Sequence, residues 1–169
     1  TLWVALDLIY PNKTEVILPL KKIARIALVF LIIQIIYGGF VAGLNAGLIH
    51  NHWPLMSEGQ LMHDSVYLEK NTWILRLTEG KSGVQFVHRT LAYVVVGLIL
   101  FLYFKSKKYT LTAAQQNGLN SLVIIVFLQF TLGVFTLLYA VPIWLGLTHQ
   151  VVAFLLLATM TFTLHRLSK

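Results

Sequence analysis

Two stretches of the sequence follow one pattern: HRTLAYVV over residues 88–95 and HQVVAFLL over residues 149–156. Each begins with a histidine near the start of a long apolar run, and each has an alanine four residues later. Residues i and i+4 lie on one face of a helix, so each histidine lies beside a gap where a large side chain is missing. Two imidazoles in an apolar bundle, each next to a space, indicate a flat macrocycle that is ligated from both sides.

The composition is that of a membrane protein. Of the 169 residues, 57% are hydrophobic and only 11% are charged, whereas soluble domains carry about 25% charged residues. The chain has no cysteine, which excludes a disulfide framework, thiolate metal sites and cysteine nucleophiles. Residues 1–10 are expected to be the tail of a preceding transmembrane helix, because they are mostly apolar and no cleavable signal follows them.

Four apolar runs are long enough to cross a membrane, since about 20 helical residues at 1.5 Å each cross a hydrocarbon core of about 30 Å. The predicted spans cover residues 26–49, 84–104, 119–141 and 143–164. They form a predicted bundle over residues 26–164, after an inner loop at 11–25 and with an outer loop at 50–83. The sequence therefore predicts an all-α integral membrane protein with a bundle of four transmembrane helices.

Positive charges predict the orientation of these spans. If the first residues end on the inner side, the inner segments carry nine basic residues and the outer segments carry four. The inner residues are Lys13, Lys21, Lys22, Arg25, Lys105, Lys107, Lys108, Arg166 and Lys169, and the outer ones are Lys70, Arg76, Lys81 and Arg89. The positive-inside rule favours this arrangement. The net charge of +7 is therefore attributed to topology rather than to nucleic-acid binding.

An internal repeat relates the first two spans to the last two. QIIYGGF over residues 34–40 matches QFTLGVF over residues 129–135 at Gln, Gly and Phe, and the second and fourth spans match through their His-x-x-x-Ala stretches. Parallel repeats of this kind are related by a pseudo-two-fold axis along the membrane normal. The repeat predicts that His88 and His149 lie at one depth near the outer surface and face each other across that axis.

Haem ligation is the favoured interpretation of these two histidines. An ionisable residue inside a span normally faces the bundle interior with a partner, and helical bundles hold haem iron through axial histidine. The alternative is two structural histidines bonded to neighbouring carbonyl groups. Arg89 has two equally weighted roles, an ion pair with a haem propionate or a contact with lipid headgroups.

Other polar and small residues carry weaker indications. His50 and His52 are two residues apart and would not share a helix face, so a metal site formed by them is not expected. His165 lies in the inner basic tail and is expected on the surface. Glycines recur every four residues from Gly39 to Gly47, a stripe that would let either another helix or a ligand approach the backbone closely.

Several motifs together resemble those of the haem A synthase family. GGFVAGLNAG over residues 38–47, with the Asn, Pro and Met of residues 51–56, resembles the fifth helix of that family and the loop after it. QFVHR over residues 85–89 resembles its sixth helix. TLGVFTLL over residues 131–138 and THQ over residues 148–150 resemble its seventh and eighth helices. The resemblance covers essentially the whole chain in the same order.

The resemblance implies a fold and a cofactor. The family has eight helices in two similar halves, and it oxidises a methyl group of haem O to the formyl group of haem A for terminal oxidases. It implies that this chain is the C-terminal half, in which His88 and His149 hold a bis-histidine haem b for electron transfer. Gln85 stands where the other half has the glutamate of a Glu-x-x-His pattern, and glutamine cannot act as a base. Gln85 and Arg89 are expected to bind the cofactor.

The resemblance also implies partners. The full-length parent would be an oxidoreductase, with substrate haem O in its N-terminal four-helix half, and these 169 residues alone are expected to be inactive. Expected partners are membrane lipid, that N-terminal half, and haem O synthase or terminal oxidase assembly factors, without nucleic acid. A bacterial cytoplasmic membrane is favoured over the mitochondrial inner membrane. The alternatives are a stand-alone b-type cytochrome that exchanges electrons with a quinone, and a haem-free transporter or assembly protein.

Overall fold

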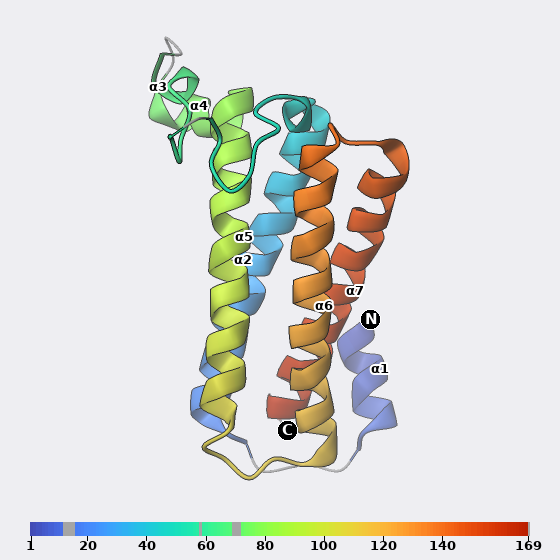
Figure 1. Cartoon of the computed structure of the whole chain (residues 1–169). Coiled ribbons are helices and arrows are strands. Elements are labelled where there is room, and N and C mark those ends of the chain that lie inside the picture. Colours follow the sequence, from blue (N-terminus) through green and yellow to red (C-terminus); the bar gives the residue numbers. More distant parts are fainter. Residues whose placement is uncertain (12–15, 58, 69–71, 169) are drawn as a thin grey trace.

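A computed structural model shows the chain as a bundle of long helices (Figure 1). The structure describes residues 1–11, 16–57, 59–68 and 72–168. Within these residues no strand occurs, and four helices of 26 residues each are long and apolar enough to cross a membrane. They are α2 (Leu18–Gly43), α5 (Lys81–Ser106), α6 (Ala113–Leu138) and α7 (Ile143–Ser168). The predicted all-α class with four membrane spans is confirmed.

Successive long helices run antiparallel and pack in a ring. The neighbouring pairs are α2 with α5, α5 with α6, α6 with α7, and α7 with α2. Helices α5 and α7, which carry the two histidines, therefore lie diagonally across the bundle. We call the end with Lys21 and Lys105 the inner end and the opposite end the outer end.

Shorter helices lie at the two ends of this bundle (Figure 1). Helix α1 (Leu2–Ile9) packs beside α7 towards the inner end. The long connection between α2 and α5 lies at the outer end and contains the 3₁₀ helix η1 (Ala46–Leu48), α3 (Ser65–Leu68) and α4 (Trp73–Thr78). The outer loop is thus partly helical and packs on the start of α5.

Local sequence explains why two helices begin and end away from the predicted spans. Helix α2 starts at Leu18 rather than 26, with Pro19 in its first turn, where the fixed φ of proline suits a helix. It ends at Gly43 rather than 49, because Asn45 adopts a left-handed conformation with φ of 52°. Helix α6 starts at Ala113 rather than 119, because Thr112 and Gln115 form a capping box.

The tightly packed core lies in the inner half of the bundle. On α2 the last buried residue is Leu31, and on α6 it is Val126. From there to their outer ends neither helix has a fully buried residue. In a bilayer, helices are held together mainly by packing contacts rather than by removal from water. The inner half therefore supplies most of the packing of α2 and α6, whereas at the outer end the buried residues of the long helices lie on α5, from Ser82 to Gln85, and on α7 at Leu145.

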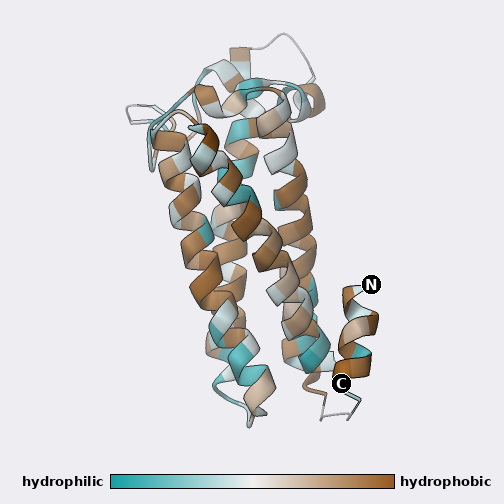
Figure 2. Ribbon diagram, turned by 90° about the vertical axis from the view of Figure 1, so that its right-hand side faces the viewer, coloured by the Kyte–Doolittle hydropathy of each residue, from teal (hydrophilic) through white to brown (hydrophobic). Residues whose placement is uncertain are grey.

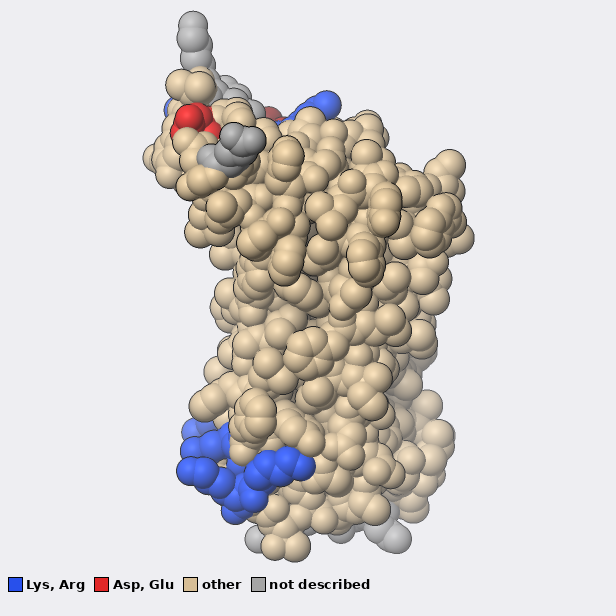
Figure 3. Space-filling view, in the orientation of Figure 1, with Lys and Arg blue, Asp and Glu red and all other residues tan. Residues whose placement is uncertain are grey.

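The surface has the polarity expected of a bundle in lipid. Figure 2 shows apolar residues along most of the length of the long helices. Figure 3 shows Lys and Arg gathered at the inner end, where α2 begins and α5 ends, with an uncharged band above them. The described basic residues of the predicted inner segments thus lie at one end of the bundle, and the side of the membrane that this end faces stays a prediction. Lys13, Lys70 and Lys169 lie outside the described residues.

Candidate functional site

The first candidate, His88, lies in the second turn of α5 from the outer end and is half-buried. Its Nε2 atom lies 3.4 Å from the amide nitrogen of Gln34 on α2. One turn further along α2, a Cβ atom on Gly38 would lie 3.3 Å from Cε1 of the imidazole. The absence of a side chain at Gly38 therefore gives the ring its place against α2.

The second candidate, His149, has the same surroundings in the other hairpin. Its Nε2 atom lies 3.1 Å from the amide nitrogen of Gln129 on α6. A Cβ atom on Gly133 would lie 2.9 Å from its Cε1. Each histidine is thus held by a glutamine and a glycine four residues apart on the preceding long helix. These matched contacts agree with the predicted repeat of two hairpins.

The structure places both histidines at a similar depth in the outer half of the bundle. Each lies in the second turn of a helix that starts at the outer end, roughly 10 Å below that start at 1.5 Å per residue. Their helices, α5 and α7, lie diagonally across the bundle. His88 and His149 therefore share one depth in the outer half of the bundle.

Polar atoms without partners mark this part of the interior. Nδ1 of His88, Nδ1 of His149, Oε1 of Gln34 and Oε1 of Gln129 are buried and make no hydrogen bond within the described residues. Buried polar groups in native proteins are nearly always hydrogen-bonded. Here the unpartnered atoms recur in repeat-related pairs, so both histidines have the same incomplete set of hydrogen bonds.

The donor set fits haem better than a bare metal ion. In the part of the chain that the structure describes, no group of three or more His, Cys, Asp or Glu side chains could hold an ion. Two imidazoles alone leave a transition metal short of ligands. A haem brings four ring nitrogens of its own and accepts histidine as a further ligand, so two imidazoles would suffice for it. Ligation by His88 and His149 stays a prediction.

Gln85 and Arg89 are bound to the outer loop. The Gln85 side chain is 2% exposed and donates hydrogen bonds to the carbonyl oxygens of Ala46, at 3.0 Å, and Ile49. Arg89 donates to four carbonyl oxygens, those of His50 at 3.3 Å, His52 at 2.8 Å, and Pro54 and Leu55 at 3.0 Å each. The expected contact of these two residues with a cofactor stays a prediction.

A cluster that the sequence did not reveal joins the outer loop to the start of α5. The rings of His50 and His63 lie 4.1 Å apart, and Nε2 of His50 lies 2.9 Å from Oγ of Ser82. Ser65 donates to Ser82 at 2.7 Å and contacts Nδ1 of His63 at 2.9 Å. Burial lowers the pKa of His50 below its usual 6.5, and the adjacent His63 lowers it further. No sequence spacing signals this contact between two loop segments.

The predicted surface position of His165 is wrong. This side chain is fully buried, and its Nε2 lies 2.8 Å from Oδ1 of Asp7 on α1. The Trp3 ring packs edge-on against it, with 4.9 Å between ring centroids. Helix α1 covers this face of α7, an arrangement that the polar tail sequence alone did not indicate.

The glycine stripe on α2 does not pack as a unit. A Cβ atom on Gly39 or Gly43 would have nothing within 4 Å, so both glycines face open space. A Cβ on Gly47 would lie 2.7 Å from a methyl group of Val141 in the turn between α6 and α7. Neighbouring side chains therefore approach the backbone closely at Gly38 and Gly47. Gly38 is not one of the glycines that recur every four residues.

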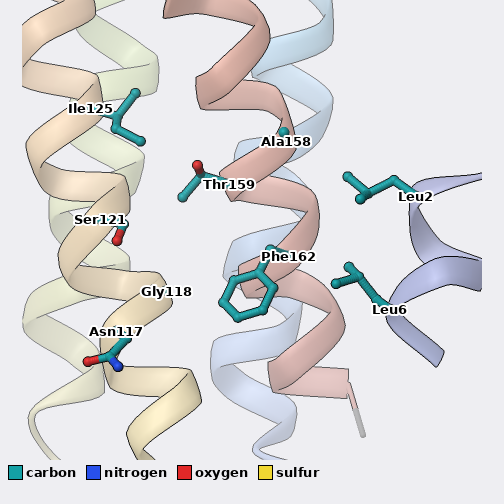
Figure 4. Close-up of a pocket in the computed structure, with 9 residues that line it drawn as sticks. All are labelled: Leu2, Leu6, Asn117, Gly118, Ser121, Ile125, Ala158, Thr159 and Phe162. Carbon is teal, nitrogen blue, oxygen red and sulfur yellow. The ribbon is translucent and has the colours of Figure 1, made fainter. Parts of the chain in front are cut away.

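A groove of about 400 Å³ lies away from the histidines, between α1, α6 and α7 (Figure 4). Leu2 and Leu6 of α1 face it from one side, and Phe162 of α7 projects towards α6 on the other. Its polar groups are those of Asn117, Ser121 and Thr159, and none of its lining residues is titratable. The groove is a feature of helix packing without acid–base or ligating groups.

The sequence of the chain is similar to that of one protein family and to several curated proteins. The COX15-CtaA family, cytochrome oxidase assembly protein, matches residues 1–161. A haem A synthase of Flavobacterium psychrophilum is 73% identical over 169 residues, 100% of this chain and 50% of that protein. That of Flavobacterium johnsoniae is 71% identical over 170 residues, with the same two shares. That of Wolbachia pipientis wMel is 39% identical over 149 residues, 88% of this chain and 40% of the relative.

The chain spans about half the length of the curated relatives it matches. These relatives are bacterial. No solved structure matches the chain significantly.

Proposed function

The chain belongs to the COX15-CtaA family of cytochrome oxidase assembly proteins, and from this premise we propose that it is the C-terminal, cofactor-binding half of a haem A synthase. In this proposal His88 and His149 are the axial ligands of one haem b. Relatives of twice this length are haem A synthases, which are oxidoreductases, and the chain is an integral membrane protein like them. The stand-alone cytochrome is less favoured, because the chain aligns along its whole length with half of a larger enzyme.

The observation that carries the proposal is the matched environment of the two histidines. Each imidazole has one nitrogen beside a glutamine amide and the other without a partner among the described residues. Both lie at one depth, on diagonal helices. A structural role for one histidine would not require a repeat-related copy opposite it. A planar ligand that is held from two sides does require such a second histidine.

Each side chain has a definite task in this proposal. His88 and His149 would hold the haem through their imidazoles, and Gly38 and Gly133 leave room for the two rings against α2 and α6. Gln34 and Gln129 restrict the rotation of each ring by hydrogen bonding. A bound haem b would supply reversible one-electron transfer. The surrounding apolar helices would exclude water from the pair, which tunes the potential of such a site.

In the full-length protein we propose that this half relays electrons. Oxidation of a methyl group of haem O to the formyl group of haem A, with water as the source of the oxygen atom, releases four protons and four electrons (R–CH3 + H2O → R–CHO + 4 H+ + 4 e−). The electrons must reach an acceptor outside this half. We place the substrate in the other half, since Gln85 precedes His88 here and an amide cannot act as a base. Haem O synthase and terminal oxidase assembly factors remain proposed partners.

The test is an absorption spectrum of the oxidised and reduced protein, beside spectra of His88→Ala and His149→Ala. We expect a low-spin b-type signal that both substitutions abolish, because each removes one axial ligand. His52→Ala is the matched control, since that histidine lies in the outer loop, and its spectrum should equal that of the unsubstituted protein. A signal that survives either substitution in the bundle would overturn the assignment of the ligands.

A further inference from the structure

One segment of the outer loop, residues 46–56, follows the end of α2 and lies against the first turns of α5 at the outer end of the bundle (Figure 1). We call this segment the outer cap. We infer that Gln85 and Arg89 are positioning residues that hold the outer cap in place and thereby shield the histidine site from water on the outer side. The shielding role rests on the proposed function, because it concerns the haem site. The attachment of the cap can be tested without a cofactor.

Arg89 is the main anchor of the outer cap. It follows His88 directly in α5, and its two terminal nitrogens donate to four backbone carbonyl oxygens at 2.8 to 3.3 Å. These four acceptors belong to residues 50, 52, 54 and 55, so one guanidinium group binds the backbone of the second half of the cap. A charged donor makes stronger hydrogen bonds than a neutral one. The cap is thus fastened to the helix that carries the first histidine.

Gln85 fastens the beginning of the outer cap to the same helix. It lies one turn before His88 and is 2% exposed. Its amide nitrogen donates to the carbonyl oxygens of Ala46 and Ile49, which frame η1. Gln85 and Arg89 therefore bracket His88 along α5, and both direct their hydrogen-bond donors to backbone atoms of the cap.

Asn51 connects the outer cap to the second hairpin. Its side-chain amide donates to the carbonyl oxygen of Gly47 at 2.8 Å and to that of Leu137, at the end of α6, at 2.7 Å. Gly47 also packs directly against Val141 in the turn between α6 and α7. The Trp53 ring contacts a phenylalanine of α6, residue 130, with ring centroids 6.4 Å apart. The cap therefore bridges α5, α6 and the outer turn.

The absence of cysteine from the chain allows a direct test of water access. Ala92→Cys places a single thiol one turn below His88, and its labelling by a membrane-impermeant, charged thiol reagent added from the outer side reports opening of the cap. We expect Arg89→Gln to raise the labelling rate roughly tenfold or more, since it removes charge-assisted hydrogen bonds. Arg89→Lys should give an intermediate rate, because an ammonium group cannot reach four dispersed carbonyls.

Arg76→Gln is the matched control. Arg76 is also an outer-end arginine, but it stacks over Trp73, at 5.4 Å from the ring centroid, rather than binding the cap. Its substitution should leave the labelling of the introduced thiol unchanged. Asn51→Ala changes the cap itself and leaves α5 intact, so it should raise the rate even if Arg89→Gln fails to fold. Rates in the Arg89 and Asn51 variants equal to that of Ala92→Cys alone would overturn the inference.

A second measurement separates positioning from simple structural support. Asn51→Ala changes no charge, yet water admitted by a loosened cap should lower the midpoint potential of the bound haem, since water stabilises its oxidised, charged form. The low-spin spectrum should persist. An unchanged potential with fast labelling would contradict the shielding role. The two proposals can fail separately. If the protein shows no b-type signal but Arg89→Gln still raises the labelling rate, the proposed function is refuted and the role of Arg89 in holding the cap is not.

Discussion

The bundle consists of a first hairpin, α2 with α5, and a second hairpin, α6 with α7. The two hairpins make the same contacts with their histidines but differ in the connection between their helices at the outer end. Inside the bundle, Gln34 and Gly38 serve His88 as Gln129 and Gly133 serve His149. At the outer end, residues 44–80 join the helices of the first hairpin, whereas the four residues 139–142 join those of the second. Two of those four, Ala140 and Val141, have left-handed φ angles of 54° and 57°.

This difference separates the repeated positions that contact the histidines from those that only connect the helices. The positions around the histidines match because both must present an imidazole to the same space. Beside His149 the positions equivalent to Gln85 and Arg89 are Gly146 and Gln150, and neither could fasten a long loop through four carbonyl groups. The second hairpin instead closes on itself with a strained turn. The contacts around the two histidines are thus duplicated, whereas the cap is part of the connection in the first hairpin and has no counterpart in the second.

The largest expected difference between the hairpins comes from their glycines. Gly133→Ala places a methyl group 2.9 Å from the His149 ring, whereas Gly38→Ala places one 3.3 Å from the His88 ring. Overpacking of this kind costs about 1–3 kcal/mol, and the shorter approach should cost more. We expect Gly133→Ala to lose most of the bound haem and Gly38→Ala to lose less, as measured by the haem-to-protein ratio after purification.

Gly39→Ala is the control for both substitutions, since a methyl group there meets nothing within 4 Å. It should bind haem like the unsubstituted protein. If Gly38→Ala proved the more damaging of the two, the second hairpin could not be the more tightly packed one, and the comparison would be reversed.

A smaller effect is expected at the inner start of the second hairpin. Thr112 and Gln115 form a capping box on α6, whereas Ile17 before α2 has no side-chain cap. Thr112→Ala should therefore lower the free energy of unfolding by about 1 kcal/mol, seen as a lower thermal midpoint in detergent. Thr110→Ala, outside the capping box, should leave the midpoint unchanged. Equal midpoints for both variants would show that packing alone defines the start of α6.

The smallest expected effect is a pH dependence confined to the first hairpin. Burial, and then His63, Arg89 and His52, lower the pKa of His50 below 6.5. A released loop binds the proton more readily than a closed one, so closure is fully stabilised above about pH 6.5 and weakens as the pH falls through the lowered pKa. Amide hydrogen exchange should therefore rise in residues 50–65 below about pH 6.5, relative to residues 139–142.

His50→Gln should abolish this extra exchange on acidification, because glutamine keeps a hydrogen-bonding group near Ser82 without titrating. A rise of equal size in the turn at residues 139–142 would point to general loosening of the protein instead of a local effect at His50.

Sequence reasoning succeeded where one physical constraint dominates. A segment in lipid must satisfy its backbone hydrogen bonds internally, so four long apolar runs without proline in their middles had to form helices. The spacing Gln-x-x-x-Gly on two of them and His-x-x-x-Ala on the others then predicted equivalent helix faces, and the contacts of His88 and His149 agree. The helix ends were less predictable, because hydropathy does not register a cap such as Thr112 or a left-handed residue such as Asn45.

The sequence by itself determined the membrane spans, their pairing into two similar hairpins and the depth of the two histidines, because these follow from apolar length and helical periodicity. Only the tertiary structure decided what Arg89 and His165 do. Arg89 binds backbone carbonyl groups 34 to 39 residues away, and every residue has a carbonyl, so no side-chain pattern marks them. His165 is buried by a partner 158 residues distant, Asp7, and burial depends on which helix covers a face rather than on the polarity of the neighbouring sequence.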